Sequence, residues 1–191
     1  MNLLGNPRIY DAAQVLAGRR ITHRRLRRAV ASARGQRVLD VGAGTGSLAR
    51  LLPPGTDYWA LDNDPGKLRR LAIKVPYAHC LEGSALAIAL PDGAVDWTVC
   101  VALAHHLDDD GLPRLCAELA RVTRDRLVFL DALWTSRRGV ANSLWRYDRG
   151  SHPRSAETLL SALGEHFELG RVERFRHLHE YVLCSGRPAR G

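Results

Sequence analysis

The chain has 191 residues, of which 46% are hydrophobic and 25% charged. This size and composition are ordinary for one globular domain with a substantial core, and they leave little room for a second domain. The first ten residues lack the basic start and apolar run of a secretory signal, and no stretch approaches the roughly 20 apolar residues of a membrane helix. We therefore expect a cytoplasmic protein.

The four cysteines are scattered and form no C-x-x-C pair; they are Cys80, Cys100, Cys116 and Cys184. In a domain of this size, such a pattern is typical of buried thiols in a reducing compartment. Because the spacing supplies no pair of ligands, we expect no zinc or other metal site.

The formal net charge is +8, with Lys67 and Lys74 as the only lysines and arginine at every other Lys or Arg position. A basic protein is a candidate for binding nucleic acid or an anionic membrane surface. The arginine bias is equally typical of a GC-rich genome, and we favour that simpler interpretation.

Two helices are predicted at the N-terminus, over Pro7–Ala17 and Thr22–Ala33. Thr22 is a suitable N-cap for the second helix. That helix places apolar residues on one side at helical spacing and gathers basic residues on the other, namely Arg24, Arg25, Arg27 and Arg28. We expect residues 1–34 to pack as helices on the domain that follows.

From Gly35 onward the signals of strands and helices alternate. The expected strands are Arg37–Val41, Tyr58–Asp62, Tyr77–Leu81, Val95–Leu103, Arg126–Leu130, Phe167–Phe175 and Glu180–Ser185. The expected helices are Gly46–Leu52, which Pro53 and Pro54 stop, Pro65–Val75, Leu112–Thr123 and Ser155–Gly164. This alternation predicts an α/β fold, a seven-stranded, mostly parallel sheet with helices on both faces and an antiparallel C-terminal strand. The domain would span residues 35–186, with 187–191 as a flexible tail.

The strongest local signal is the segment Val38–Gly46, where a buried strand runs into three glycines at alternate positions. Glycines permit a tight turn and let a ligand lie against bare backbone. A following helix would present its free N–H groups at the same place. In a parallel sheet, the crevice at the carboxyl ends of the strands is where ligands bind.

Two carboxylates flank this loop and indicate the type of ligand. Asp62 ends the next strand, 22 residues after Asp40, where a carboxylate can accept both hydroxyls of a ribose. The glycine pattern is G-x-G-x-G, one residue shorter than the dinucleotide fingerprint. Asp40, two residues before the first glycine, would repel a pyrophosphate and suit a ligand that carries an ammonium and a sulfonium group. The pair therefore favours S-adenosylmethionine over NAD.

From about Gly35 to Ser185 the chain resembles class I S-adenosylmethionine-dependent methyltransferases, which have a Rossmann-like fold. The closest pattern is that of type 11 domains related to the quinone-biosynthesis enzymes. The matching segments are Asp40–Gly46 with motif I, Glu82–Ala85 and Leu90-Pro91 with the G-D-A…L-P stretch, Ala94–Leu107 with the fourth strand and its H-H-L ending, and Glu118–Val122 with the helix before strand five. Ser84 stands where that family usually has aspartate.

The resemblance implies a role for each part of the cofactor site. Asp40 and the backbone of Gly42, Ala43, Gly44 and Gly46 would face the methionine part of S-adenosylmethionine, and Asp62 would bind the ribose. The adenine would be edged by Asn63, Ser84 and Ala85. The backbone near Val101 and Ala102 would lie under the cofactor, and Tyr10 would close its other side.

Catalysis of methyl transfer depends mainly on holding the nucleophile, the methyl group and the sulfur in line. A general base is needed only if the acceptor must lose a proton. His105 and His106 follow the fourth strand at the open edge of the crevice, and an imidazole suits this role. We prefer His106 as the base; a helix-capping or packing role for either histidine stays open. Asp131, directly after the fifth strand, would orient the substrate or assist as a base, or else cap a turn.

A polar, aromatic stretch between Asp131 and Ser155 is too irregular for a plain connection. Long loops over an active site usually carry function. We expect this stretch to form a lid whose aromatic rings stack on a flat or apolar acceptor. The candidate substrate-binding residues are Trp134, Trp145, Tyr147 and Arg149. The alternative is that the two tryptophans are only packing anchors.

The short chain leaves no room for a separate substrate domain, so we expect a small-molecule acceptor, such as a natural product, a quinone or a lipid-like compound. A monomer or homodimer and peripheral membrane contact are compatible with this. Three alternatives remain: an RNA-modifying methyltransferase, a cofactor-binding module without catalysis, and a dehydrogenase. No RNA-binding module is appended, and Ala102–His105 replaces the N-P-P-Y motif of amino-group methyltransferases that act on nucleobases. Both observations disfavour nucleic acid.

Overall fold

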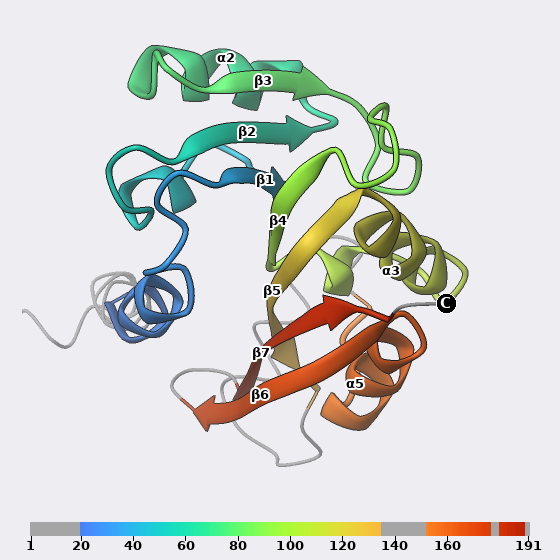
Figure 1. Ribbon diagram of the computed structural model, residues 1–191. Helices are drawn as coiled ribbons and strands as arrows, with labels where there is room; N and C mark the ends of the chain where they lie inside the picture. The colour runs from blue at the N-terminus through green and yellow to red at the C-terminus, as the bar shows by residue number, and fades with distance from the viewer. Residues whose placement is uncertain (1–19, 135–151, 177–179, 190–191) are drawn as a thin grey trace, which may run out of the picture.

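The computed structural model describes residues 20–134, 152–176 and 180–189, and its centre is one seven-stranded sheet (Figure 1). The strands lie in the order β3-β2-β1-β4-β5-β7-β6. Their bounds are β1 Arg37–Val41, β2 Asp57–Asp62, β3 His79–Glu82, β4 Val95–Val101, β5 Thr123–Leu133, β6 Phe167–Arg176 and β7 Glu180–Pro188.

Strand β7 is the one strand of this sheet that runs against its neighbours. It pairs antiparallel with β5, where Leu130 lies opposite Leu183, and antiparallel with β6, where Phe175 lies opposite Tyr181. The ladders among β1 to β5 are all parallel. The predicted fold class is therefore confirmed, including the antiparallel C-terminal strand.

Helices cover both faces of the sheet because successive strand residues point to opposite sides. On one face α3 (Gly111–Val122) and α5 (Ala156–Gly164) pack against residues such as Leu39, Leu127 and Phe129. On the other face lie α2 (Pro65–Lys74) and a helix whose described part is residues 20–29, packed against Val38, Val128 and Leu130. β1 and β4, buried on both sides, fix the centre of the molecule.

Several predicted boundaries differ from the observed ones. Thr22 lies inside the helix and is not its N-cap, because residues 20 and 21 are already helical. The segment expected to be a helix over Gly46–Leu52 contains only the 3₁₀ helix η2 (Leu48–Arg50). The prolines at 53 and 54 leave too few residues for a stable α-helix after the glycine loop. Strand β7 continues to Pro188, so the first two residues of the predicted tail are paired with β6.

Some predicted features lie outside the described residues, namely the helix Pro7–Ala17, Tyr10, Trp145, Tyr147 and Arg149. Within residues 20–134, 152–176 and 180–189, no helix combines the length and apolar character needed to cross a bilayer.

Candidate functional site

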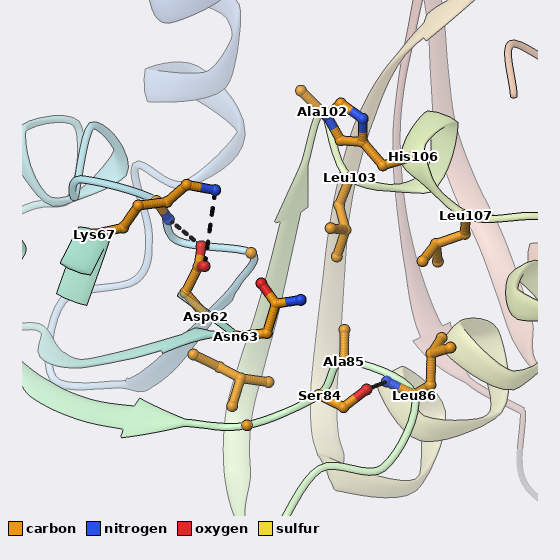
Figure 2. A pocket seen from close by; sticks show the side chains of 14 residues that line it. Asp62, Asn63, Lys67, Ser84, Ala85, Leu86, Ala102, Leu103, His106 and Leu107 are labelled. Atoms are coloured by element: carbon orange, nitrogen blue, oxygen red, sulfur yellow. Dashed lines mark hydrogen bonds and ion pairs between the residues drawn. The ribbon is translucent and has the colours of Figure 1, made fainter. Parts of the chain in front are cut away.

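A pocket of about 460 Å³ lies where β1, β2 and β4 end (Figure 2). The parallel strands bring their carboxyl ends to one edge of the sheet, which is the expected place for a ligand. The pocket is lined by Gly42, Gly44, Leu61, Asp62, Asn63, Lys67, Gly83, Ser84, Ala85, Leu86, Ala102, Leu103, His106 and Leu107. Its size is within the range of pockets that hold small molecules and cofactors.

The glycine loop gives the pocket a wall of bare backbone. Gly42 and Gly44 have φ values of 77° and 56°, a region that residues with a side chain rarely adopt. A Cβ atom on Gly42 would lie 3.1 Å from the side chain of Leu103, whereas Gly44 faces open space. Gly46 serves a different purpose, since its Cβ would lie 2.8 Å from Leu71 of α2. Gly46 therefore permits packing of α2 under the loop and does not line the pocket, and neither does the buried Ala43.

Asp62, 6% exposed, connects the loop to the end of β2. Its Oδ2 accepts the N–H of Gly44 at 2.8 Å, and its Oδ1 accepts the N–H of Asp64 at 2.9 Å. A carboxylate oxygen can accept more than one hydrogen bond, so each oxygen retains capacity for a hydroxyl of the ligand. Lys67, which the sequence analysis did not single out as a site residue, reaches Asp62 Oδ1 at 3.9 Å and also lines the pocket.

The opposite wall is formed by the turn after β3. Asn63 points into the space between β2 and this turn (Figure 2). Ser84 Oγ accepts the N–H of Leu86 at 3.1 Å, which leaves its O–H able to donate to a ligand. Ala85 lies beside it on the lining. These three predicted adenine contacts are thus brought together.

The third wall is the end of β4, where the backbone turns sharply. Ala102 has a φ of 54°, the only positive value at a non-glycine residue in the described ranges. Such a conformation costs of the order of 1 kcal/mol or more, and strained residues of this kind cluster at functional sites. The turn places Leu103 against the glycine loop and His106 on the lining. Val101, also predicted as a contact, lies one residue short of the pocket.

Asp40 departs from the position expected from the sequence. It is 3% exposed, accepts a hydrogen bond from the Tyr58 hydroxyl at 2.8 Å, and does not line the pocket. The reason is the two-residue period of β1, which directs Asp40 to the same face as Val38 and into the apolar cluster around Tyr58. The carboxylate that lines the pocket and could attract a cationic ligand is therefore Asp62, whose negative charge Lys67 partly offsets.

Burial raises the pKa of Asp40 to about 7, the Tyr58 hydrogen bond opposes this shift, and the nearby charge of Asp62 adds to it. The folded state thus holds a proton that the unfolded chain releases near its usual pKa of 3.8. This retained proton stabilises the folded state fully below pH 3.8, the pKa of Asp40 in the unfolded chain. The stabilisation is lost as the pH rises through the pKa of about 7 in the folded state.

We therefore expect the cofactor-free protein to lose about 2–3 kcal/mol of unfolding free energy from this group between pH 5 and pH 8. Asp40→Asn, which cannot ionise, should lack this part of the pH dependence. Urea unfolding of both proteins across that range measures the difference. Identical pH slopes for the wild type and Asp40→Asn would contradict the assignment.

The three predicted catalytic residues form one cluster at the end of β4 and β5. His106 is exposed on the pocket lining, whereas His105 is 8% exposed and lies behind it, with ring centroids 4.1 Å apart. His105 Nδ1 is 2.5 Å from Oδ1 of Asp131, which is fully buried. Asp131 also accepts the N–H of Ala132 at 2.7 Å. Asp131 thus orients His105, and only His106 reaches the pocket directly.

A buried arginine that the sequence analysis missed holds this cluster in place. Arg154, 8% exposed, donates to the carbonyls of Ala104 at 2.9 Å and Leu107 at 2.8 Å. These carbonyls flank the histidines of the 3₁₀ helix η3 (Ala104–His106). Arg154 also binds the exposed carboxylate of Asp109, and its carbonyl accepts the N–H of Trp134. No local pattern could reveal it, because 50 residues separate Arg154 from Ala104.

Among the predicted acceptor contacts, only Trp134 is described. It is 49% exposed at the end of β5 and is not part of the pocket lining. Trp145, Tyr147 and Arg149, like Tyr10 on the cofactor side, lie outside the described residues, so the proposed lid stays a prediction.

The cysteines are free thiols, and three are buried as expected, but Cys80 is exposed on the edge strand β3. No group of three or more His, Cys, Asp or Glu side chains gathers into a metal-binding cluster within the parts of the chain that are described.

Comparison with protein families identifies the domain that contains this pocket. Residues 38–126, which run from β1 into β5, match the family described as "Methyltransferase domain". This segment supplies the glycine loop, Asp62 and both histidines. Residues 38–126 form a class I methyltransferase domain.

Two relatives with sequence similarity support the assignment of the methyltransferase domain. An uncharacterized methyltransferase of Mycobacterium tuberculosis is 44% identical over 90 residues, which is 47% of this chain and 36% of the relative. The malonyl-[acyl-carrier protein] O-methyltransferase of Serratia marcescens is 36% identical over 122 residues, 63% of this chain and 46% of that protein. The match thus spans less than half the length of either relative.

The architecture has a solved counterpart. Magnesium protoporphyrin IX methyltransferase from Synechocystis PCC 6803, crystallised with bound S-adenosylhomocysteine (SAH), superposes with a TM-score of 0.75. The superposition covers 93% of this chain and 86% of that one, at 15% identity, so it speaks for the shared fold. The narrower resemblance to quinone-biosynthesis enzymes stays a prediction.

S-adenosylmethionine is the cofactor of class I methyltransferase domains, and the pocket fits it. The glycine backbone leaves room for close approach, and Asp62 keeps lone pairs free for a ribose diol. Asn63 and Ser84 supply polar groups for an adenine edge, and Leu61 and Leu86 add apolar surface to the same lining. The residues present therefore suit an adenosyl ligand.

Proposed function

We propose that this chain is an S-adenosylmethionine-dependent methyltransferase that acts on a small-molecule acceptor. The observation that carries the proposal is one pocket that combines a bare glycine backbone, a carboxylate able to accept ribose hydroxyls, and an imidazole. Gly44 and Asp62 provide the first two, and His106 lines the same space from the other side. A pocket that only bound the cofactor would not require the imidazole on its lining.

The cofactor supplies an electrophilic methyl group, and the chain's own residues provide position and proton transfer. Asp62, Asn63 and Ser84 would hold the adenosine end. His106 would accept the proton of an acceptor that must lose one, with its turn fixed by Arg154. The His105–Asp131 pair would keep the neighbouring ring in one orientation. A base in this position typically contributes about 10²–10⁴-fold to the rate.

The nature of the relatives supports a small acceptor. The Serratia marcescens relative is named for methylation of a malonyl group on an acyl carrier protein, and the Synechocystis protein for a porphyrin. We infer that the acceptor here is likewise an organic molecule with a hydroxyl or carboxyl oxygen, presented free or on a carrier. Four free cysteines are in keeping with a cytoplasmic location.

The test is formation of SAH from S-adenosylmethionine with a panel of acceptors. The panel contains phenols, malonyl thioesters, fatty acids, small amines and an RNA transcript, and product is followed by mass spectrometry. We expect turnover with at least one of the oxygen acceptors.

Tight binding of SAH without turnover on any acceptor would favour a cofactor-binding module. Methylation of the RNA alone would overturn the small-molecule assignment while preserving the methyltransferase activity. Tight binding of NAD in place of SAH would contradict both.

A further inference from the structure

A second pocket, of about 230 Å³, shares no lining residue with the first and has four arginines in its lining. It is formed by the helix over residues 20–29 together with β5, β6 and β7. In Figure 1 the blue helix lies on the left, whereas β2 and β3 point their carboxyl ends to the right. The lining residues are Arg25, Arg28, Ala29, Arg126, Arg171, Glu173, Leu183, Cys184 and Ser185.

One carboxylate and two guanidinium groups form the inner part of this arginine pocket. Glu173 accepts Arg25 Nε at 2.6 Å through one oxygen and Arg171 at 3.2 Å through the other. Arg25 donates to Glu173 through Nε. Among the described residues, the two terminal Nη groups of Arg25 make no hydrogen bond. Glu173 is thus satisfied by two arginines, and the positive charge of the pocket exceeds the negative charge.

Among the described residues, the remaining two arginines of the pocket form no salt bridge with an acidic side chain. Within the described ranges, Arg28 and Arg126 make no ion pair and no hydrogen bond through their side chains. The helix around Arg28 offers no acidic partner, because residues 20–37 contain no aspartate or glutamate. Four guanidinium groups against a single carboxylate, converging on a hollow, repel one another unless an anion joins them.

Two of the arginines are held in fixed orientations by aromatic rings. The guanidinium of Arg25 lies 4.4 Å from the ring centroid of Phe175, and that of Arg126 lies 4.8 Å from the ring of Trp97, which is buried. Stacking of this kind orients the planar donor fork before any ligand arrives. Because the guanidinium groups are already oriented, less side-chain entropy is lost when a ligand binds. This preorganisation is typical of a binding site and not of an ordinary charged surface.

The strand β6 is deformed at the edge of this pocket. Its register with β7 shifts between Leu169 and Val172, so a β-bulge lies at Gly170 and Arg171. Bulges re-aim side chains and are frequent next to sites. Here the bulge accompanies the placement of Arg171 on the pocket lining.

We propose that the arginine pocket binds a phosphate group. The volume is below the roughly 300 Å³ at which pockets begin to hold whole drug-sized ligands, so it suits a group of a few atoms. Guanidinium forks bind tetrahedral phosphate oxygens through charge-assisted, often bidentate, hydrogen bonds. The Ser185 hydroxyl on the lining adds a neutral donor. The phosphate belongs either to a small molecule or to the backbone of RNA, since both present the same oxygens.

The experiment titrates the full chain with inorganic phosphate by calorimetry at constant, low ionic strength. Arg28→Gln/Arg126→Gln removes the two unpaired arginines, and we expect the dissociation constant for phosphate to rise at least about tenfold. Arg70→Gln/Arg114→Gln is the matched control. It removes the same charge from exposed positions on α2 and α3 and should leave phosphate binding unchanged.

Absence of saturable phosphate binding, or an equal loss in both double variants, overturns the proposal in favour of diffuse charge. If the Arg126 substitution disturbs folding, Arg28→Gln alone carries the test, because Arg28 is exposed. Titration with SAH should be unaffected in either variant, which separates this proposal from the methyltransferase proposal.

A competition arm identifies the source of the phosphate. Displacement of inorganic phosphate by a short single-stranded RNA, with a steep dependence on salt, assigns the site to a phosphodiester backbone. Displacement by a small phosphomonoester but not by RNA assigns it to a small molecule. Either result supports a phosphate-group site.

Discussion

Replacing Asp62 with alanine is expected to weaken SAH binding by about 10²–10⁴-fold. The carboxylate would accept two ribose hydroxyls, and hydrogen bonds to a charged group contribute about 1.5–3 kcal/mol each. Asp62→Asn should lose less, since one oxygen acceptor remains. Calorimetric titration with SAH measures both constants.

The control for this prediction must separate ligand contact from loop structure. Asp62 also accepts the N–H groups of Gly44 and Asp64, so its removal disturbs the loop. The thermal unfolding temperature of each variant, measured without ligand, reports how far the substitution destabilises the loop. Asp110→Asn, an exposed residue outside the pocket lining, should bind SAH as the wild type does. Wild-type affinity of a folded Asp62→Ala protein would rule out the ribose contact.

His106→Ala is expected to lower kcat by about 10²–10³-fold with an acceptor that must lose a proton, while SAH binding stays within a few fold. The reason is that His106 lines the pocket after β4, whereas the adenosine would contact Asp62, Asn63 and Ser84. Steady-state kinetics with the best acceptor from the panel gives kcat and KM separately.

Two further variants test whether the His105–Asp131 pair affects the reaction by positioning His106. Asp131→Asn removes the charge opposite His105 Nδ1 and should lower kcat less than His106→Ala does. His166→Ala, beyond α5 and outside the pocket lining, should leave kcat unchanged. If His106→Ala kept the wild-type kcat and raised only KM, the histidine would be an acceptor-binding residue and not a base.

The centre of the sheet could be predicted from local patterns because β1, β2 and β4 are short and largely buried. β1 was predicted at its observed bounds, and β2, β4 and α5 within one or two residues. The failure at Gly46–Leu52 has a physical cause, since a loop and a double proline compete for the same few residues. Strand β5 is longer than expected because its polar first residues pair with β4 and its end pairs with β7.

The site was predicted in part. Gly42, Gly44, Asp62 and His106 do come together, because each follows the carboxyl end of a parallel strand or lies in the turn after it. The burial of Asp40 was not predicted, because the sequence pattern did not show that Asp40 faces the apolar core beneath β1 and not the pocket.

The sequence by itself determined the α/β class, the glycine loop and the residues at the ends of β2 and β4, because these depend on short-range periodicity. Tertiary structure alone decided that Tyr58 would cover Asp40, that Arg154 would hold the histidine turn, and that arginines from a helix and two strands would share one pocket. The physical reason is that a side chain's partners across the sheet depend on strand order and register. Those are set by the packing of the whole chain and not by the residues on either side.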